Sequence, residues 1–309
     1  MVFENILDAI GGTPMVKLNR MADANSAEIL VKVEGLNVGG SIKTRTAYNM
    51  LREAAAQGIL TKDSIICEPT SGNQGIGIAL VGAVCGYQVE VVMPDSVSEE
   101  RRKLMTQYGA KVILVPDEGD IGKCIAQCLE AAQRRAAEDP RVYIPQQFIN
   151  PNNPLAHING TGHEILEQVD GPIHGFCSGI GTGGTISGVG QVLREKNPDI
   201  EIWAIEPEKA AILSGGPIGT HMQMGIGDGL IPENLDQKIY DSVCIVSDEE
   251  AIATARRLAR EEGLLCGISS GTNVAAALRL AKKLGPGKRV VTILPDSGER
   301  YFSTPLFEE

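Results

Sequence analysis

The sequence predicts an α/β protein whose sheets are mostly parallel and are flanked by helices. Strand-like and helix-like segments alternate along the 309 residues, a pattern typical of β-α-β units. Glycine-rich turns at 39–43, 70–75 and 179–185 lie where such folds bind ligands. At roughly 150 residues per domain the length indicates two domains. The turn-rich segment 150–154 is the predicted joint between them.

The composition is that of an ordinary soluble globular protein, with 43% hydrophobic and 22% charged residues. The net charge of −11, without a long lysine or arginine run, argues against nucleic acid and anionic membranes as partners. No basic and apolar leader opens the chain, and the longest apolar stretch, 76–93, is interrupted by glycine, glutamine and glutamate. That stretch therefore predicts a helix, a turn and a strand, and no membrane span.

The seven cysteines are scattered, and most lie in apolar runs. An odd number at such positions favours reduced core residues of a cytoplasmic protein over a set of disulfides. Cys124 and Cys128 are four residues apart on a predicted helix, but neither a histidine nor a second cysteine pair lies near them. No metal site is therefore predicted.

The first half of the chain predicts alternating elements up to the joint. Helices are expected at 5–10, 41–57, 76–85, from a capping box at 96–99 to Gly109, and at 121–138. Strands are expected at 28–33, 64–67, 89–93 and 111–115. Within 41–57, small and apolar residues recur on one helical face, and Gly58 supplies the glycine that commonly ends a helix.

The second half continues the alternation. Helices are expected at 155–169, 185–196, 247–262 and 272–284, and strands at 175–178, 201–206 and 289–294. Ser247, followed by three acidic residues, is a predicted helix cap. The segment 207–245 is irregular and rich in glycine, which predicts functional loops.

The turn at 179–185, Gly-Ile-Gly-Thr-Gly-Gly-Thr, indicates a phosphate site. It matches the dinucleotide pattern Gly-x-Gly-x-x-Gly, and Glu206 ends the next strand about 20 residues on. More generally, the turn presents several exposed backbone N–H groups at a helix N-terminus, and such groups bind phosphate. The hydroxyls of Thr182 and Thr185 add donors. On this turn alone, a dehydrogenase remains an alternative.

Lys43 suggests which phosphate compound is bound. It follows the pair Gly39-Gly40, which lets a bulky ligand approach the backbone closely. A lysine that is desolvated there has a lowered pKa and becomes a usable amine for a Schiff base. A phosphate turn together with such a lysine suits pyridoxal 5′-phosphate, which carries both an aldehyde and a phosphate.

Two further turns offer polar groups to the same site. The turn at 70–75, Thr-Ser-Gly-Asn-Gln-Gly, provides hydroxyls, amides and helix N-terminal N–H groups that suit an amino-acid carboxylate. In Gly-Ile-Ser-Ser-Gly at 267–271, Ser269 either caps a helix or faces the pyridine nitrogen of the cofactor. A neutral hydroxyl there weakens the ring as an electron sink, which favours elimination of a β-substituent.

Six ordered motifs resemble the cysteine synthase family, which comprises fold type II enzymes dependent on pyridoxal phosphate. The motifs lie at 39–43, 68–73, 147–151, 181–185, 267–271 and 295–301, so the resemblance spans essentially the whole chain. It displaces the dehydrogenase interpretation. It implies a smaller, mobile substrate-binding domain at about 35–150, and a larger cofactor-binding domain formed by 1–34 and 151–309.

The resemblance also implies residue roles. Lys43 binds the cofactor covalently and then carries the α-proton, Asn73 bonds the ring hydroxyl, and Ser269 faces the ring nitrogen. The implied phosphate-binding residues are Gly181, Thr182, Gly183, Gly184 and Thr185. The implied substrate-binding residues are Thr70, Ser71, Asn73, Gln74, Gln147 and Gly225. A β-substituent leaves to give an α-aminoacrylate, a nucleophile then adds, and the enzyme is a homodimer.

The sequence departs from the family pattern at four positions. Val38 and Thr44 replace a proline and an aspartate, and Gln74 replaces a threonine of the substrate loop. Asp228 stands where the family loop Gly-Ile-Gly-Ala-Gly has alanine. A carboxylate there repels hydrosulfide and is a candidate base for water, or a group that binds an amine. The alternative is that Asp228 points to solvent.

We therefore hypothesise a variant that takes L-cysteine, releases hydrogen sulfide and adds water, giving L-serine, or a thiol, giving lanthionine. The first alternative is ordinary synthesis of L-cysteine from O-acetyl-L-serine and sulfide. An alternative of another class is a non-catalytic binding or regulatory protein with the same fold. Docking of a serine acetyltransferase tail at the active site stays open.

Overall fold

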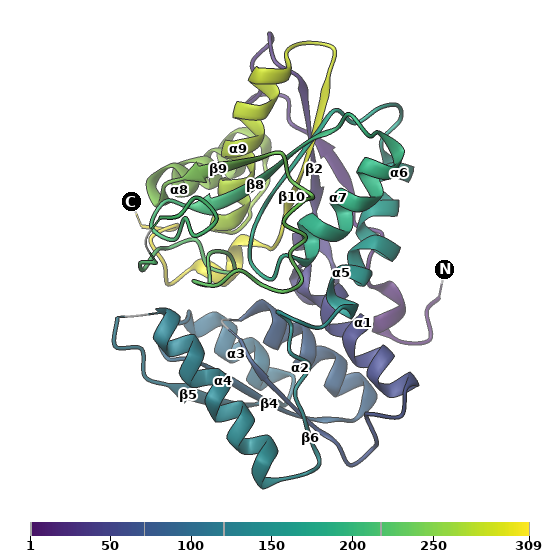
Figure 1. Cartoon of the computed structure of the whole chain (residues 1–309), viewed down its shortest axis with the longest axis vertical. Coiled ribbons are helices and arrows are strands. Elements are labelled where there is room, and N and C mark those ends of the chain that lie inside the picture. Colours follow the sequence, from purple (N-terminus) through teal and green to yellow (C-terminus); the bar gives the residue numbers. More distant parts are fainter. Residues whose placement is uncertain (1, 71, 120, 217, 309) are drawn as a thin grey trace.

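The computed structural model describes residues 2–70, 72–119, 121–216 and 218–308. Two sheets organise these residues, one with the strand order β1-β2-β10-β7-β8-β9 and the other with the order β5-β4-β3-β6. Figure 1 shows them in separate halves, one above the other, with helices around each. The predicted α/β class is therefore confirmed.

The four-stranded half lies within the range 35–150. Its strands are all parallel and comprise β3 (Ile65–Pro69), β4 (Gln88–Pro94), β5 (Lys111–Val115) and β6 (Val142–Tyr143). Its helices are α1 (Lys43–Ala56), α2 (Asn73–Cys85), α3 (Glu99–Gln107) and α4 (Ile121–Glu138). Separate apolar clusters pack α1 and α2 on one side of the sheet and α4 on the other, so helices cover both faces.

The six-stranded half uses the N-terminal segment and the second half of the chain. Its strands are β1 (Met15–Lys17), β2 (Glu28–Val33), β7 (Gly175–Gly179), β8 (Glu201–Pro207), β9 (Ser242–Val246) and β10 (Arg289–Leu294). Its helices are α5 (Asn152–Ala156), α6 (His163–Gln168), α7 (Gly184–Lys196), α8 (Asp248–Arg257) and α9 (Ile268–Leu284). All neighbouring strands are parallel except β1, which runs antiparallel to β2.

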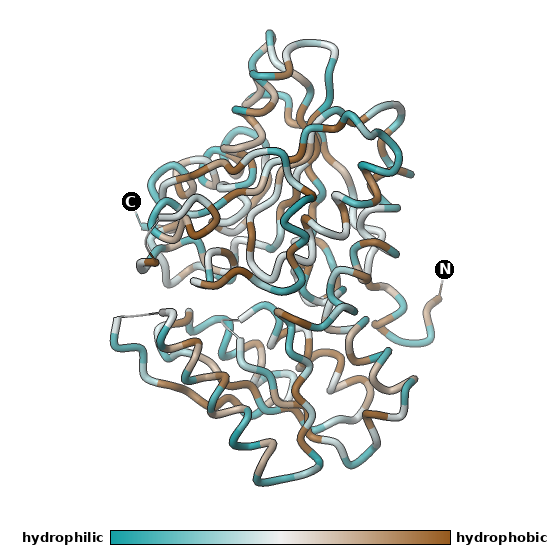
Figure 2. Tube along the Cα trace, viewed as in Figure 1, coloured by the Kyte–Doolittle hydropathy of each residue, from teal (hydrophilic) through white to brown (hydrophobic). Residues whose placement is uncertain are grey.

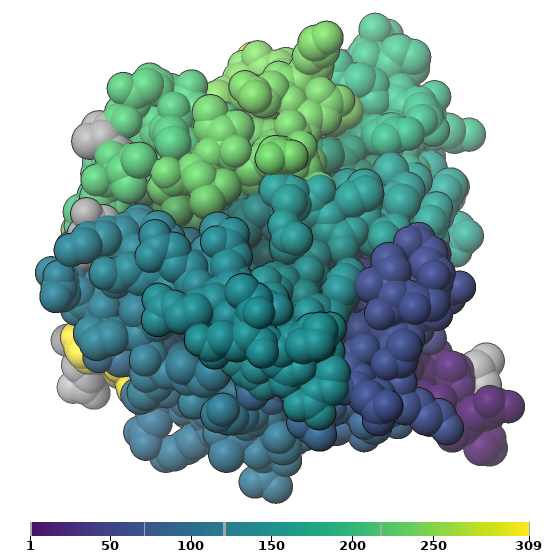
Figure 3. Space-filling model, turned by 60° about the horizontal axis from the view of Figure 1, so that its bottom comes forward, coloured from purple at the N-terminus to yellow at the C-terminus, as the bar shows by residue number. Residues whose placement is uncertain are grey.

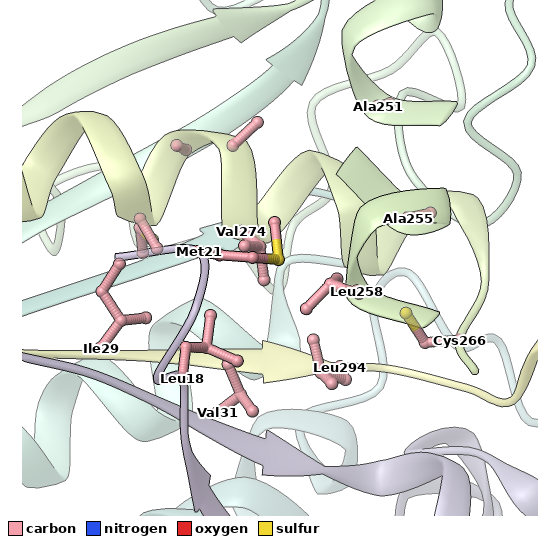
Figure 4. Packing of buried hydrophobic residues seen from close by; sticks show 14 of the residues in the cluster. Leu18, Met21, Ile29, Val31, Ala251, Ala255, Leu258, Cys266, Val274 and Leu294 are labelled. Atoms are coloured by element: carbon pink, nitrogen blue, oxygen red, sulfur yellow. The ribbon is translucent and has the colours of Figure 1, made fainter. Parts of the chain in front are cut away.

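Apolar side chains fill the space between this sheet and its helices. Figure 4 shows Ile29, Val31 and Leu294 on the strands facing Val274 of α9 and Leu258 beyond α8. On the other face, Phe176 and Ile202 belong to a second cluster together with residues of α7. Six of the seven cysteines are buried, as predicted for core residues, whereas Cys85 is exposed. Figure 2 shows hydrophobic segments inside both halves and hydrophilic ones over many outer turns.

Several predicted elements differ from the structure. Strands β1, β6 and β9 were not predicted; they are short, and β9 extends into the segment expected to be irregular. The capping box at 96–99 is wrong, because Ser98 is the N-cap but its hydroxyl donates to the carbonyl of Arg300 (3.0 Å). The helix expected at 5–10 is a single 3₁₀ turn, Ile6–Ala9.

The helix expected at 155–169 is also interrupted. A wide π-helical turn, His157–Gly162, separates α5 from α6. Gly162 packs closely on α7 there, since a Cβ at this position would lie 2.9 Å from Cβ of Val192. Such turns are irregularities that often accompany functional sites.

A buried ion cluster joins α1 to the six-stranded half. Arg45 of α1 lies between Glu34 (Nε to Oε2, 2.9 Å) and Glu164 (Nη1 to Oε1, 2.6 Å). Lys32 of β2 also contacts Glu164 (2.7 Å). These contacts lower the pKa of the Glu164 carboxyl to about 2 against the opposing effect of burial. The cluster therefore fixes the helix that begins at Lys43.

We expect Arg45→Met to lower the free energy of unfolding by about 3 kcal/mol or more, because it leaves the buried Glu34 carboxylate without a cation and Glu164 with Lys32 alone. The matched control is Arg52→Met on the same helix, whose partner Glu53 lies at the surface. That change should cost less than about 1 kcal/mol. Urea unfolding followed by circular dichroism measures both, and equal losses would contradict this account of the cluster.

No helix among the described residues is long and apolar enough to cross a membrane. Nor do the described histidines, cysteines and carboxylates form a group of three or more that suits a metal ion.

Candidate active site

A cavity of 570 Å³ lies between the two halves, beside the carboxyl ends of β3 and β7. Figure 3 shows the blue and teal residues of the four-stranded half packed directly against the green residues of the other half. The cavity brings together most of the site residues predicted from the sequence. Those that line it are Lys43, Thr70, Asn73, Gln74, Gln147, Gly181, Thr182, Gly183, Thr185, Gly225, Asp228 and Ser269.

Lys43 is the first residue of α1, and its half-buried side chain lines the cavity. The preceding turn needs glycine, because Gly39 and Gly40 have φ values of 74° and 70°. Desolvation lowers the pKa of the Lys43 amine, and the carboxylates of Asp228 and Asp296 partly oppose this effect. The lowered pKa makes the neutral, reactive amine accessible closer to neutral pH.

The turn at 181–185 places donors at one end of the cavity. Gly183 (φ 78°) is the N-cap of α7, so the helix N-terminus meets this turn. The hydroxyl oxygen of Thr182 accepts a hydrogen bond from Nδ2 of Asn153 (2.9 Å), which leaves its hydrogen for a ligand. Gly184 does not line the cavity. It packs on Asn153, whose Oδ1 would lie 2.0 Å from an added Cβ.

The turn at 70–75 lies on the side of the four-stranded sheet. The hydroxyl of Thr70 accepts from the backbone N–H of Gly72 (3.1 Å). Gln74 is 1% exposed, and its Oε1 accepts from the hydroxyl of Thr46 (2.8 Å). Its Nε2 has no hydrogen-bond partner within the described parts of the chain, so a donor remains for a ligand. Ser71 lies outside the described residues.

The amide of Asn73 is held at both ends. Its Nδ2 donates to Oδ2 of Asp296 (2.7 Å), and its Oδ1 accepts from Nη1 of Arg300 (2.7 Å). Because Asp296 accepts and Arg300 donates, the two partners determine which way the amide is turned. One N–H of Asn73 is left for another acceptor.

Ser269 and Asp228 approach the cavity from the six-stranded half. Ser269 lies in the first turn of α9, whose N-cap is Gly267, and its side chain is buried. Asp228 is half-buried on the loop between β8 and β9. Burial raises the pKa of the Asp228 carboxyl, whereas Lys43 and His221 lower it. The carboxylate of Asp228 is therefore near enough to Lys43 for each to affect the other.

Several cavity residues were missed by sequence reasoning. Arg101 belongs to a strongly charged helix, yet it is 2% exposed and donates to the Tyr301 hydroxyl (2.8 Å). Asn273 accepts from the N–H of Gly179 (2.8 Å) at the end of β7. An apolar wall comes from α4 and the loops; its members are Ile125, Ala126, Leu129, Phe148, Ile218 and Leu230.

In the dinucleotide pattern, an acidic residue at the end of the next strand binds a ribose hydroxyl, but Glu206 has other partners. Its carboxylate accepts from the backbone N–H groups of Leu213 (2.5 Å) and Ser214 (3.1 Å). It therefore holds the loop that follows β8.

The donor set fits pyridoxal 5′-phosphate. A helix N-terminus with glycines and two threonine hydroxyls suits the phosphate, and Lys43 supplies an amine with a lowered pKa for the aldehyde. The family model "Pyridoxal-phosphate dependent enzyme" matches residues 6–296, and the chain belongs to this family.

Known relatives narrow the class. A curated cysteine synthase of Staphylococcus aureus (strain Mu50) is 48% identical over 305 residues, which cover 98% of this chain and 97% of that protein. A hydrogen sulfide-producing enzyme from Fusobacterium nucleatum superimposes with a TM-score of 0.92 at 40% identity, covering 97% of this chain and 100% of that one. An O-ureido-L-serine synthase gives 0.93 at 40% identity, with 100% and 96% covered.

The protein is thus similar to cysteine synthases over its full length. It is an enzyme of the cysteine synthase family, it uses pyridoxal 5′-phosphate, and its reaction is β-elimination or β-replacement on a small amino acid. These comparisons displace a non-catalytic binding protein as an interpretation.

Proposed function

We propose that the enzyme takes L-cysteine, releases hydrogen sulfide and adds water to the remaining three-carbon unit, giving L-serine. A second molecule of L-cysteine in place of water gives lanthionine. The observation that carries this proposal is the Asp228 carboxylate, which lines the cavity and lies near Lys43. The cofactor, when bound, holds the amino group of the substrate and withdraws electrons from its α-carbon.

The substrate carboxylate is assigned to the turn at 70–75 and to Gln147. The N-terminus of α2, the hydroxyl of Thr70 and the unpartnered Nε2 of Gln74 offer donors there. Gln147 supplies a further amide on the same cavity wall. At the opposite end, Gly181, Thr182, Gly183 and Thr185, which line the cavity, would hold the cofactor phosphate, whereas Gly184 packs on Asn153. The substrate's reacting carbons would then lie beside Lys43.

Lys43 moves the α-proton. Its Nζ is desolvated, so the neutral amine accepts the proton from the α-carbon while the carbon–sulfur bond breaks. The sulfur leaves as hydrosulfide and takes up a proton to become hydrogen sulfide. The protonated Nζ later returns a proton to the α-carbon, and cysteine plus water thereby become serine plus hydrogen sulfide.

Asp228 acts on the nucleophile. Its carboxylate accepts a proton from water, or from the thiol of a second cysteine, as the new bond to the β-carbon forms. Burial raises its pKa, which makes it a stronger base than an exposed aspartate. The same negative charge repels hydrosulfide and so disfavours the reverse addition.

Water access and the cofactor environment are set by neighbouring residues. The apolar wall from α4 limits solvent around the reacting atoms. Ser269 would offer its neutral hydroxyl to the ring nitrogen, and Asn73 would offer its remaining N–H to the ring hydroxyl. The loop that carries Asp228 packs against Gly181 through Gly225. A Cβ added to Gly181 would lie 2.3 Å from the carbonyl oxygen of Gly225, so the two backbones are in close contact.

A second candidate function is synthesis of L-cysteine from O-acetyl-L-serine and sulfide. The relative from Staphylococcus aureus favours it, because that protein is a cysteine synthase at 48% identity. The same Lys43 chemistry serves both reactions, and the two differ in the leaving group and in the nucleophile. A homodimer remains a prediction of the family resemblance, and a cytoplasmic location remains a prediction from the cysteine pattern. Docking of a serine acetyltransferase tail stays open.

One panel of assays separates the two functions. The holoenzyme is given L-cysteine, L-serine, O-phospho-L-serine or O-acetyl-L-serine, each with and without sulfide, and products are identified by mass. We expect serine or lanthionine and sulfide from L-cysteine to form with a higher kcat/KM than cysteine from O-acetyl-L-serine. The reverse order would favour the second candidate.

A further inference from the structure

Glu68 is the penultimate residue of β3. Its carboxylate binds the backbone at residues 146–147, a corner of the chain that carries the Gln147 side chain into the cavity wall. The side chain of Glu68 is 0% exposed. Oε2 accepts from the backbone N–H of Gln146 (2.9 Å), and Oε1 accepts from the backbone N–H of Gln147 (2.9 Å). One buried carboxylate thus binds two successive N–H groups, a strong, charge-assisted arrangement.

The corner needs such support. Gln146 has φ 59°, a left-handed conformation that no other non-glycine residue adopts in the described parts of the chain. An uncommon conformation of this kind persists when neighbouring groups determine it. Glu68 supplies the charged contact at this point, and it binds both sides of the strained residue.

Gln147 is fixed from its other side by neutral groups. Its carbonyl accepts from Nδ2 of Asn153 (2.7 Å) and from Nδ2 of Asn234 (2.8 Å). The same Nδ2 of Asn153 donates to the hydroxyl of Thr182 in the phosphate turn. The position of Gln147 therefore connects the substrate side of the cavity to the phosphate side.

The charge of Glu68 is sensitive to pH. Burial raises the pKa of its carboxyl to about 7, and the two backbone N–H groups oppose that rise. The titratable groups close enough to respond to its charge are Tyr143 on β6 and Cys67 on β3, whose pKa values it helps to raise. Glu90 on β4 pairs with Arg135 and Lys111 instead.

We propose that Glu68 is a positioning residue of the amino-acid site, and that protonation of its carboxylate weakens substrate binding through Gln147. A protonated carboxyl keeps one carbonyl oxygen as an acceptor and presents a hydroxyl to the other N–H, so one of the two bonds is lost. The backbone at residues 146–147 is then held less firmly, and the side-chain amide of Gln147 moves away from the substrate carboxylate. The inference rests on the proposed role of Gln147 in substrate binding.

The test is binding of L-alanine to the holoenzyme, followed by the absorbance of the cofactor, between about pH 5.5 and about pH 8.5. L-Alanine has no leaving group, so the result does not depend on sulfide release. Glu68→Gln mimics the protonated acid in shape. We expect the two proteins to have the same Kd at the acidic end. Above pH 7 the wild type should bind about tenfold more tightly than the variant.

Two controls isolate the effect. Glu90→Gln, which changes a buried carboxylate on the neighbouring strand, should keep the pH profile of the wild type. In a Gln147→Ala background, Glu68→Gln should change Kd less than twofold. Wild-type affinity of Glu68→Gln above pH 7, or a constant difference at every pH, would overturn the proposal. If L-alanine binding behaves as expected but no sulfide forms from L-cysteine, only the proposed reaction fails.

Discussion

Replacing Lys43 by alanine is expected to lower sulfide release from L-cysteine by at least about a thousandfold, because the variant has no group in place to carry the α-proton. The phosphate turn is untouched, so pyridoxal 5′-phosphate should still bind but no longer be fixed to the protein by borohydride. The measurement is sulfide release together with mass spectrometry of the reduced protein.

The matched control for this variant is Lys103→Ala, which removes a lysine from the exposed face of α3. It should retain full turnover. The wild-type rate should fall as pH drops through the lowered pKa of Lys43, since the protonated amine cannot accept a proton. Lys43→Ala with more than a few per cent of wild-type turnover would contradict the assigned role.

Asp228→Ala is expected to reduce serine formation from L-cysteine by about a hundredfold or more, the usual contribution of a general base. The variant keeps Lys43, so exchange of the α-proton of L-cysteine with solvent should continue. Synthesis of cysteine from O-acetyl-L-serine and sulfide should be retained or increase, because the negative charge that repels hydrosulfide has been removed.

The pH profile gives a second check on Asp228. Wild-type serine formation should fall as the pH drops through the raised pKa of the Asp228 carboxyl, because the protonated acid no longer accepts a proton. Asp228→Asn has a similar shape and cannot titrate, so its remaining activity should not show that step. Deuterium incorporation at the α-carbon, measured by mass, separates loss of this base from loss of Lys43.

The sequence predicts the parts of the site that depend on local structure. Lys43 follows a glycine pair that the turn requires, and the turn at 179–185 ends a strand and begins a helix, so both positions follow from short-range pattern. The α/β class follows from the alternation of strands and helices in the same way. Asp228 lines the cavity because of the course of the long loop between β8 and β9, which short-range pattern does not determine.

The residues that were missed depend on contacts between distant segments. Arg101 is buried against Tyr301, which lies 200 residues later and both accepts a hydrogen bond from it and stacks its ring near the guanidinium. Glu68 has its partners at 146–147, nearly 80 residues later in the chain. The interruption at His157–Gly162 lies where Gly162 packs against α7, a segment more than 20 residues later. Hydrophobic periodicity carries no information on such buried polar contacts.

The central claim is that Asp228 directs the enzyme toward addition of water or a thiol and away from sulfide. It is tested most directly by the ratio of serine plus lanthionine formed from L-cysteine to cysteine formed from O-acetyl-L-serine and sulfide. We predict a ratio well above one for the wild type and well below one for Asp228→Ala. Equal sulfide release from L-cysteine by both proteins, with serine still formed by the variant, would contradict the claim.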